Sequence, residues 1–334
     1  MGTSINVIDF NGELCYKLDC SNFSALFCPG IGANMLRLQD TKNNLEILHY
    51  DEKISIEKLK QDICLYGIPT LYLPNRFHKG ILKASDNTYS LPINEPDFNN
   101  FIHGFLHQRA FKVTNTLCDE AFCSITAEFD YDNTDEFYKY YPLDFKATIT
   151  YTLSNSGLEY LFKIKNLSKN MLPVVAGNHT AINLPLSKYS KDEDLRIKAN
   201  IFEKLTLNDS LVCTGEALPL KDYDLLFKDG KMNPLTTSID NDMYSVDTTA
   251  ESKDGLNVVE IFDVKSGKGI RYETGKEYKY WLFWNHWGNA GFCCPEPMSA
   301  MIDASNISLP DKVTGYTELK PGETWTGFQR ISTF

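Results

Sequence analysis

The sequence lacks the features that would direct it to a membrane, to nucleic acid or to a secretory pathway. It contains no apolar run of about 18 residues, the length that a membrane helix requires. The N-terminal residues Met-Gly-Thr-Ser-Ile-Asn form neither the basic nor the apolar region of a signal peptide. Acidic residues outnumber basic ones by 44 to 33, and the net charge of −11 disfavours nucleic acid and anionic membranes as partners. We therefore expect a cytoplasmic protein.

Signatures of cofactors, metals and repeats are missing as well. There is no Gly-rich phosphate loop, no repeat with a period of about 20–50 residues and no composition break typical of a linker. None of the nine cysteines forms a Cys-x-x-Cys pair, and their spacing to the six histidines fits no zinc pattern. Because most cysteines stand among apolar residues, as in Leu-Phe-Cys28, we expect all nine, Cys15 and Cys28 included, to remain reduced. We expect neither a metal nor a cofactor.

Aromatic residues are abundant, with 18 Tyr and 20 Phe, and this composition favours strands. Apolar runs separated by turn signals predict strands over residues 111–117, 122–130, 145–153, 159–166, 257–264, 269–273 and 278–284. Residues 51–62 form the one predicted helix, with Ile54 and Leu59 on its apolar face. The sequence therefore predicts an all-β protein, with a single large antiparallel domain over residues 1–334.

Three further segments carry weaker signals. Residues 130–141 are acidic and aromatic, which indicates an exposed hairpin tip. Residues 187–235 are polar and rich in turn residues, with no strong period. Near the C-terminus, Pro321-Gly322 predicts a hairpin turn between two edge strands.

One histidine, His179, lies within the apolar stretch of residues 172–186, directly after Gly177 and Asn178. The alternation of apolar and polar residues that follows it is typical of a strand with one face in a core. Imidazole changes charge near neutral pH, so its surroundings decide whether it donates or accepts a proton. Taken alone, such a histidine is more often a core residue whose hydrogen bonds are satisfied than a catalytic one.

A single carboxylate, Glu296, lies in the stretch Phe-Cys-Cys-Pro-Glu-Pro-Met at 292–298. Glutamate is rarely buried unless it is paired, and the prolines on both sides stiffen the chain around it. The alternative is a loop glutamate exposed to water. A preorganised acid and base from distant parts of one chain are what proton-transfer chemistry requires, so His179 and Glu296 form the candidate pair.

A third segment, residues 64–82, contains two prolines and two glycines, which predict irregular backbone. It displays Asn75 and Arg76 from a loop or a strand end. A surface salt bridge is the alternative reading of Arg76. Further on, Gly104 follows His103 and allows another backbone segment to approach closely.

In this order and spacing, His179, Glu296, His103-Gly104, Asn75-Arg76 and Pro321-Gly322 resemble the aldose 1-epimerase (galactose mutarotase) family, and in particular a divergent bacterial branch of it. The resemblance runs nearly end to end. It implies a large twisted antiparallel β-sandwich, called a supersandwich, with the sugar site in its concave cleft.

The same resemblance implies roles for individual residues. Gly-Asn-His179 is similar to the motif that carries the general acid, and Pro-Glu296-Pro to the motif that carries the general base. Asn75 and Arg76 resemble the pair that binds sugar hydroxyls, and His103 the histidine near the ring oxygen. Asp242 resembles the aspartate that holds ring hydroxyls, and Asp240 is its rival, because Asn241 separates the two.

The aromatic segment before Glu296 departs from the family pattern, since it reads Tyr-Trp-Leu-Phe-Trp-Asn-His-Trp. Trp281, Trp284 and Trp287 could stack on a sugar or fill the core. The resemblance implies that the protein interconverts α and β anomers of a neutral aldose such as glucose or galactose, as a monomer or a homodimer. Glu296 would take the O1 proton while His179, as imidazolium, protonates the ring oxygen.

Two expectations follow from these roles. Mutual attraction should lower the pKa of Glu296 and raise that of His179, so the acidic limb of a bell-shaped pH profile would belong to Glu296 and the alkaline limb to His179. As a loop side chain, Arg76 should be removable with a loss of activity and little loss of stability.

Three other functions remain open. A hexose-6-phosphate 1-epimerase would need a cluster of cations at the cleft, but only Arg76 and Arg109 lie near matched motifs. A carbohydrate-binding protein would need no catalytic pair. A glycoside hydrolase would need two carboxylates around the scissile bond, and only Glu296 has a motif.

Overall fold

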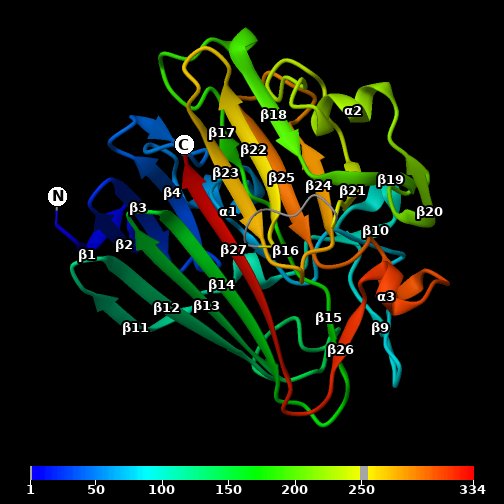
Figure 1. Ribbon diagram of the computed structural model, residues 1–334. Coiled ribbons are helices and arrows are strands. Elements are labelled where there is room, and N and C mark those ends of the chain that lie inside the picture. Colours follow the sequence, from blue (N-terminus) through cyan, green and yellow to red (C-terminus); the bar gives the residue numbers. More distant parts are fainter. Residues whose placement is uncertain (1, 249–254) are drawn as a thin grey trace.

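The computed structural model describes residues 2–248 and 255–334 (Figure 1). Its strands form three large sheets and three two-stranded ones, and every ladder between these strands is antiparallel. Among the described residues the longest helix has 7 residues, and none is long and apolar enough to cross a membrane. The prediction of an all-β fold built from antiparallel sheets is therefore confirmed.

The N-terminal sheet is a meander that contains, in order, β1 (Ser4–Phe10), β2 (Glu13–Cys20), β3 (Phe23–Cys28), β4 (Asn34–Asp40) and β5 (Leu45–Glu46). The outer sheet contains, in spatial order, β11 (Lys112–Cys118), β12 (Phe122–Tyr131), β13 (Phe145–Ser154), β14 (Gly157–Asn166), β27 (Thr324–Thr333), β23 (Gly269–Thr274), β22 (Asn257–Asp263) and β18 (Leu195–Ala199).

The inner sheet contains, in spatial order, β20 (Cys213–Pro219), β19 (Ile201–Leu207), β21 (Asp242–Val246), β24 (Tyr280–Trp284), β25 (Phe292–Met298), β16 (Gly177–Asn178) and β6 (Thr70–Leu71), and β17 (Ile182–Asn183) also pairs with β25. The two-stranded sheets are β7 (Arg76–His78) with β10 (Asn100–Ile102), β8 (Ile81–Lys83) with β9 (Thr88–Ser90), and β15 (Leu172–Val174) with β26 (Thr317–Leu319).

The helices are short. The α-helices are α1 (Ile56–Gln61), α2 (Asp222–Lys228) and α3 (Asp311–Thr314), and the single 3₁₀ turns are η1 (Ile63–Leu65), η2 (Pro96–Phe98), η3 (Leu106–Gln108), η4 (Asp192–Asp194) and η5 (Ala304–Asn306). The predicted helix begins later than expected, because Ser55 caps α1 by accepting a hydrogen bond from the backbone N–H of Lys58 at 3.2 Å.

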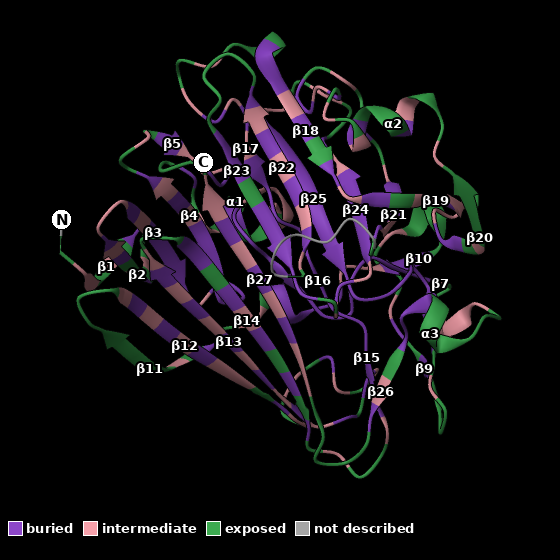
Figure 2. Cartoon of the chain, viewed as in Figure 1, coloured by how far each residue is buried: buried purple, intermediate pink, exposed green. Residues whose placement is uncertain are grey.

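The outer and inner sheets pack face to face, as the alternating burial of their strands shows. In β13 every second residue is buried, as one face of a two-layer sandwich requires, whereas all seven residues of β25 are buried (Figure 2). Tyr272 of β23 contacts Trp281 of β24 with ring centroids 5.5 Å apart. Strand β25 thus runs through the interior, and its one charged side chain is buried with it.

The N-terminal sheet packs beside the outer sheet and has a small core of its own. Phe27 of β3 contacts Tyr151 of β13 with ring centroids 5.6 Å apart. A second apolar cluster, which includes Phe10, Leu59 and Ile63, joins this sheet to α1 and η1. This cluster supports the segment that leads into residues 64 and 65.

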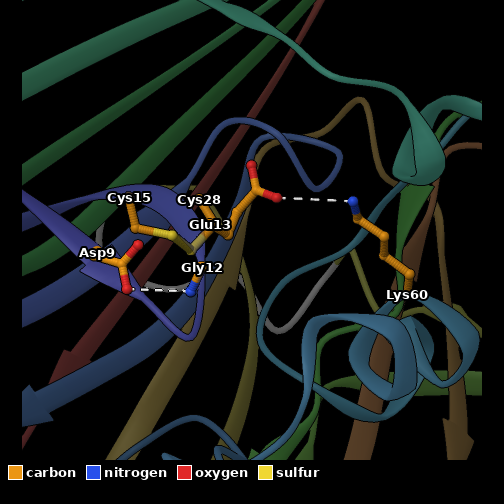
Figure 3. Close-up of a disulfide and its surroundings, with 6 residues drawn as sticks. All are labelled: Asp9, Gly12, Glu13, Cys15, Cys28 and Lys60. Carbon is orange, nitrogen blue, oxygen red and sulfur yellow. Dashed lines mark hydrogen bonds and ion pairs between the residues drawn. A yellow bond between two sulfur atoms is a disulfide. The ribbon is translucent and has the colours of Figure 1, made fainter.

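A disulfide joins Cys15 of β2 to Cys28 of β3, near the ion pair between Glu13 and Lys60 (Figure 3). The expectation that all nine cysteines are reduced is therefore wrong for these two. Cys15 and Cys28 stand opposite each other, one position beyond the Tyr16–Phe27 pair of the β2–β3 ladder, and their Cα atoms are 4.5 Å apart, within the range that a disulfide spans. The other seven are free thiols, as expected. Because disulfides are uncommon in reducing compartments, the bond between Cys15 and Cys28 is unusual for the cytoplasmic protein that the sequence predicts.

Three local expectations are wrong. Residues 187–235 contain β18, β19, β20 and α2. Of these, β20 is an exposed edge strand without apolar alternation, so the sequence does not signal it. Strand β27 lies between β14 and β23 in the centre of the outer sheet, so it is neither an edge strand nor the hairpin partner of β26. Within residues 130–141, Phe137 and Tyr141 are buried, so this segment is not an exposed tip.

Candidate active site

Five side chains selected from the sequence line one cavity of about 360 Å³: Asn75, Arg76, His103, His179 and Glu296. This volume lies within the range of sites that hold small molecules. The cavity is completed by residues from several loops and from β24, including Cys64, Leu65, Glu95, Asp240, Asn241, Trp284 and Trp287. We call it the main cavity.

Glu296 is placed by β25, where it stands opposite Leu282 of β24. Its neighbours Pro295 and Pro297 cannot donate backbone hydrogen bonds, and proline is rare inside sheets for that reason. Here the far side of β25 is only partly paired, since β16 meets it at Met298 and β17 at Cys293 and Phe292. The prolines therefore fit beside an interruption in the sheet, and His179 lies in the chain segment that crosses this interruption.

His179 follows β16 directly and is brought close to β25 by Gly177. A Cβ atom on Gly177 would come within 2.6 Å of the sulfur of Met298 and 2.8 Å of the carbonyl oxygen of Pro297. Only glycine therefore allows the two strands this approach. The backbone N–H of His179 then donates to the carbonyl oxygen of Pro69 at 3.1 Å, which fixes the residue at the end of the short strand.

A buried hydrogen-bond network holds the backbone on both sides of His179. Gln329, on the central strand β27, donates to Oδ1 of Asn178 at 2.6 Å and accepts from the hydroxyl of Tyr272. That same hydroxyl is 2.9 Å from Oγ1 of Thr180. Because these side chains come from the outer sheet, the packing of the two sheets determines where His179 lies.

Nε2 of His179 lies 3.1 Å from Oε1 of Glu296, and both residues are almost wholly buried, at 5% and 1% exposure. The second carboxylate oxygen, Oε2, is buried and has no hydrogen-bond partner among the described residues. Buried polar atoms nearly always have a partner, so an unpartnered carboxylate oxygen here marks Glu296 as a candidate for a role in chemistry.

Burial controls the protonation of this pair. It lowers the pKa of His179 to about 4 and raises the pKa of Glu296 well above its ordinary value of 4.5. Arg76 opposes the second shift, since its positive charge lowers the pKa of Glu296, but burial is the larger effect. The expectation that mutual attraction dominates is therefore wrong, because desolvation penalises both charged forms more strongly.

Asn75, Arg76 and His103 come together through the β7–β10 hairpin. Ile102 stands opposite Arg76 in this ladder, and the backbone N–H of His103 donates to the carbonyl oxygen of Asn75 at 2.9 Å. The ring of His103 packs edge-on against that of His179, with centroids 5.3 Å apart. Burial and the neighbouring histidines lower the pKa of His103 well below its ordinary value, so it is neutral at pH 7.

The close approach expected at Gly104 is present. Gly104 has φ +66°, and a Cβ atom there would lie 2.2 Å from the carbonyl oxygen of Tyr72. Any side chain would separate these segments and displace His103 from the cavity wall.

Arg76 is buried and fully paired, which the sequence did not indicate. Its Nε and one terminal nitrogen donate to the two carboxylate oxygens of Glu95 at 2.9 Å each, and the other terminal nitrogen donates to Oδ1 of Asn241 at 2.8 Å. Glu95 and Asn241 are therefore cavity residues that sequence reasoning missed. The polar loop of residues 87–104 offered no motif that would single out Glu95.

Asp242 is not among the residues that line the main cavity. Its carboxylate accepts from Nζ of Lys204 at 2.6 Å and from the hydroxyl of Tyr223 at 2.9 Å, so it belongs to a network on the inner sheet. Asp240, which lines the cavity, is held by a hydrogen bond from Nδ2 of Asn241 at 2.8 Å. Of the two aspartates, the structure brings Asp240 to the candidate site.

The three tryptophans selected from the sequence lie in two different places, the core and the main cavity. Trp281 is fully buried in the core between the sheets. Trp284 and Trp287 line the main cavity, and the ring of Trp284 lies edge-on to His179 with centroids 5.5 Å apart. Trp287 is 59% exposed, so its ring is available to cover a ligand at the cavity mouth.

The fold and the cavity together define a large antiparallel β-sandwich protein with a buried carboxylate–imidazole pair at a small-molecule site. Comparison with known families gives the same class: the family model for aldose 1-epimerase matches residues 15–332. This chain belongs to the aldose 1-epimerase family.

Solved structures with the same fold agree. A galactose mutarotase-like protein from Clostridium acetobutylicum is 28% identical, with a TM-score of 0.95, and the match covers 100% of this chain and 99% of that one. The galactose 1-epimerase of Lactobacillus acidophilus is 14% identical, with a TM-score of 0.70 and 99% of each chain covered. The second likeness, at its low identity, is a likeness of fold.

The burial of Arg76 changes what its removal should do. Arg76→Met leaves the carboxylate of Glu95 with its hydrogen bond from Nδ2 of Asn100 at 2.9 Å but without its cation, so we expect a loss of about 1–3 kcal/mol in the free energy of unfolding, measured by denaturant titration. The double variant Arg76→Met/Glu95→Gln should recover part of this loss, because it also removes the unpaired charge. A single variant as stable as the wild type would show that the ion pair contributes nothing.

Proposed function

We propose that the protein is a mutarotase that interconverts the α and β anomers of a neutral aldose such as glucose or galactose. The observation that carries the proposal is the buried pair of His179 and Glu296, 3.1 Å apart at the wall of the main cavity, with one carboxylate oxygen that has no hydrogen-bond partner among the described residues. Membership of the aldose 1-epimerase family supports the same reaction.

Ring opening needs two proton transfers. The carboxylate of Glu296 takes the proton of the C1 hydroxyl, and the electron pair of that O–H bond forms the carbonyl as the bond from C1 to the ring oxygen breaks. The ring oxygen receives a proton from the imidazolium of His179. Rotation about C1–C2 and the reverse transfers close the ring on the other face. Each positioned group typically contributes about 10²–10⁴-fold.

The resting protonation state is compatible with these roles. A neutral acid beside a neutral imidazole and a carboxylate beside an imidazolium contain the same number of protons. Transfer of one proton from Glu296 to His179, whose Oε1 and Nε2 atoms lie 3.1 Å apart, converts the first form to the second. Arg76 favours the carboxylate form of Glu296, and sugar hydroxyls that donate to this carboxylate would favour it further.

Charges around the main cavity support a neutral sugar over a sugar phosphate. Among the described residues that line it, Arg76 is the one cation with a fixed charge, and Glu95 neutralises it, while Asp240 adds another carboxylate. A phosphate would find no unpaired cation there. Polarimetry with glucose, galactose and glucose 6-phosphate tests this choice, and faster turnover of the phosphate would favour a hexose-6-phosphate 1-epimerase instead.

The catalytic pair is tested by amide replacements that keep its shape. Glu296→Gln removes the base and His179→Gln the acid, so each should slow mutarotation by about 10²–10⁴-fold, measured by polarimetry. The double variant should be scarcely slower than either single one, because the two groups act as a unit. Glu216→Gln, at an exposed position, is the matched control.

Mutarotation at the wild-type rate by Glu296→Gln would contradict the mechanism. A wild-type protein that binds sugar without accelerating mutarotation would instead be a carbohydrate-binding protein of the same fold.

The pH dependence should follow the buried pair. Below a pH of about 4 His179 gains a proton while Glu296 keeps its own, so no base remains; above the raised pKa of Glu296 the pair loses its last proton and no acid remains. We expect kcat/KM to form a broad bell whose acidic limb belongs to His179 and lies near pH 4, and whose alkaline limb belongs to Glu296. An acidic limb centred at pH 6 or above would contradict this assignment.

A further inference from the structure

A second cavity, of about 570 Å³, adjoins the main one. The two share five lining residues, which form a common wall: Cys64, Leu65, Ile102, His103 and Trp284. We call the second cavity the side chamber. A single hexose placed against Glu296 would leave it unused, so it offers room for a larger substrate.

The floor of the side chamber is aromatic. Phe101, Phe105 and Phe137 line it and stack on one another, with centroids 5.5 Å apart for Phe101 and Phe137 and 4.4 Å apart for Phe105 and Phe137. The three phenylalanines are 2%, 2% and 8% exposed, so they make the floor apolar without offering an open aromatic face. The apolar C–H groups of a pyranose ring can rest on such a floor.

Polar side chains surround this floor. Gln61 and Gln108 are exposed at the chamber, and no hydrogen bond from either side chain is present within the described residues. His107 also lines the chamber; it is 5% exposed, and its Nδ1 has no hydrogen-bond partner there. Burial lowers the pKa of His107 to about 4, so at neutral pH its ring can donate or accept.

The charges of the chamber disfavour an anionic ligand. Arg109 lines it, but its guanidinium donates to both carboxylate oxygens of Asp135 at 2.7 and 2.9 Å. Two further carboxylates belong to the lining, Asp62, which pairs with Lys58 at 2.6 Å, and Glu136, which lies 3.5 Å from Arg109. A phosphate, a nucleotide or a uronic acid would meet this acidic rim unfavourably, whereas a neutral sugar would find donors and acceptors.

The common wall indicates how a second sugar would be attached. The ring of His179, which protonates the ring oxygen in the proposed mechanism, contacts two residues of that wall, His103 at 5.3 Å and Trp284 at 5.5 Å between centroids. The ring oxygen of the first sugar would therefore face the side chamber. On an aldohexose the ring oxygen is bonded to C5, which carries C6.

We infer that the side chamber holds the second ring of a neutral reducing disaccharide joined through C6 of the sugar that is epimerised. This inference rests on the proposed function, because the first ring must lie with C1 at Glu296. The second ring packs on the phenylalanine floor, and its hydroxyls bond to Gln61, Gln108 and His107.

Disaccharides that differ only in linkage provide the test. Isomaltose and gentiobiose are joined through C6, whereas maltose and cellobiose are joined through C4 of the same reducing glucose. We expect kcat/KM for the C6-linked member of each pair to exceed that of its C4-linked partner by about tenfold or more, a factor that one or two good contacts supply. Polarimetry of each disaccharide against free glucose gives these ratios.

Gln108→Trp narrows the chamber from an exposed position, so it should lower kcat/KM for isomaltose and gentiobiose about tenfold relative to kcat/KM for glucose. Thr116→Trp, at an exposed position on β11 outside both cavities, is the matched control and should leave that ratio unchanged.

The outcomes separate the two proposals. Turnover of glucose without preference for C6 linkage, or a Gln108→Trp variant with an unchanged ratio, would overturn the inference and leave the mutarotase intact. If glucose is not turned over, the proposed function fails, and calorimetry still decides the chamber: isomaltose should bind the wild type more tightly than maltose and lose that advantage in Gln108→Trp. Equal binding of isomaltose and maltose to the wild type would overturn the inference about the side chamber.

Discussion

The close approach of His179 and Glu296, with Nε2 and Oε1 3.1 Å apart in a nearly solvent-free cavity wall, is the constraint on which this site depends. In water both charged forms would be hydrated, so the carboxylate and the imidazolium would cost little free energy. With 5% and 1% exposure, each charged form loses its hydration, so burial favours the neutral acid and the neutral imidazole over the ion pair. The proton needed for ring opening is already in the pair. A bound sugar and Arg76 only have to favour its transfer.

Such a pair can exist only because the sheets hold it. The inner strand β25 buries Glu296, and Gly177 brings β16 close enough for His179 to reach it. Gln329, on the central strand of the outer sheet, then fixes Asn178 through a short hydrogen bond. The residues that define the site thus come from both sheets, and packing of the sandwich is what maintains a distance of 3.1 Å.

Much of this was accessible from the sequence, because strands and tight turns leave local signals. The strands from β11 to β14 and the residues Asn75, Arg76, His103, His179 and Glu296 were all recognisable by pattern or motif. The predictions that failed concern contacts between residues that are far apart in the sequence. The ion pair of Arg76 with Glu95, the placement of Asp240 in place of Asp242, and the disulfide at Cys15 are set by how loops and strands meet in three dimensions. The pKa directions failed for the same reason, since burial is a tertiary property.

Nitrogen-15 NMR of labelled histidine, with His179→Gln used to assign the signal, tests the account most directly, because it reports the charge of that imidazole without reference to catalysis. The account predicts a neutral ring at pH 7 that titrates with a pKa of about 4 in the free protein. An imidazolium at pH 7 would contradict it, because attraction to Glu296 would then outweigh burial and the ionised pair would be the resting state.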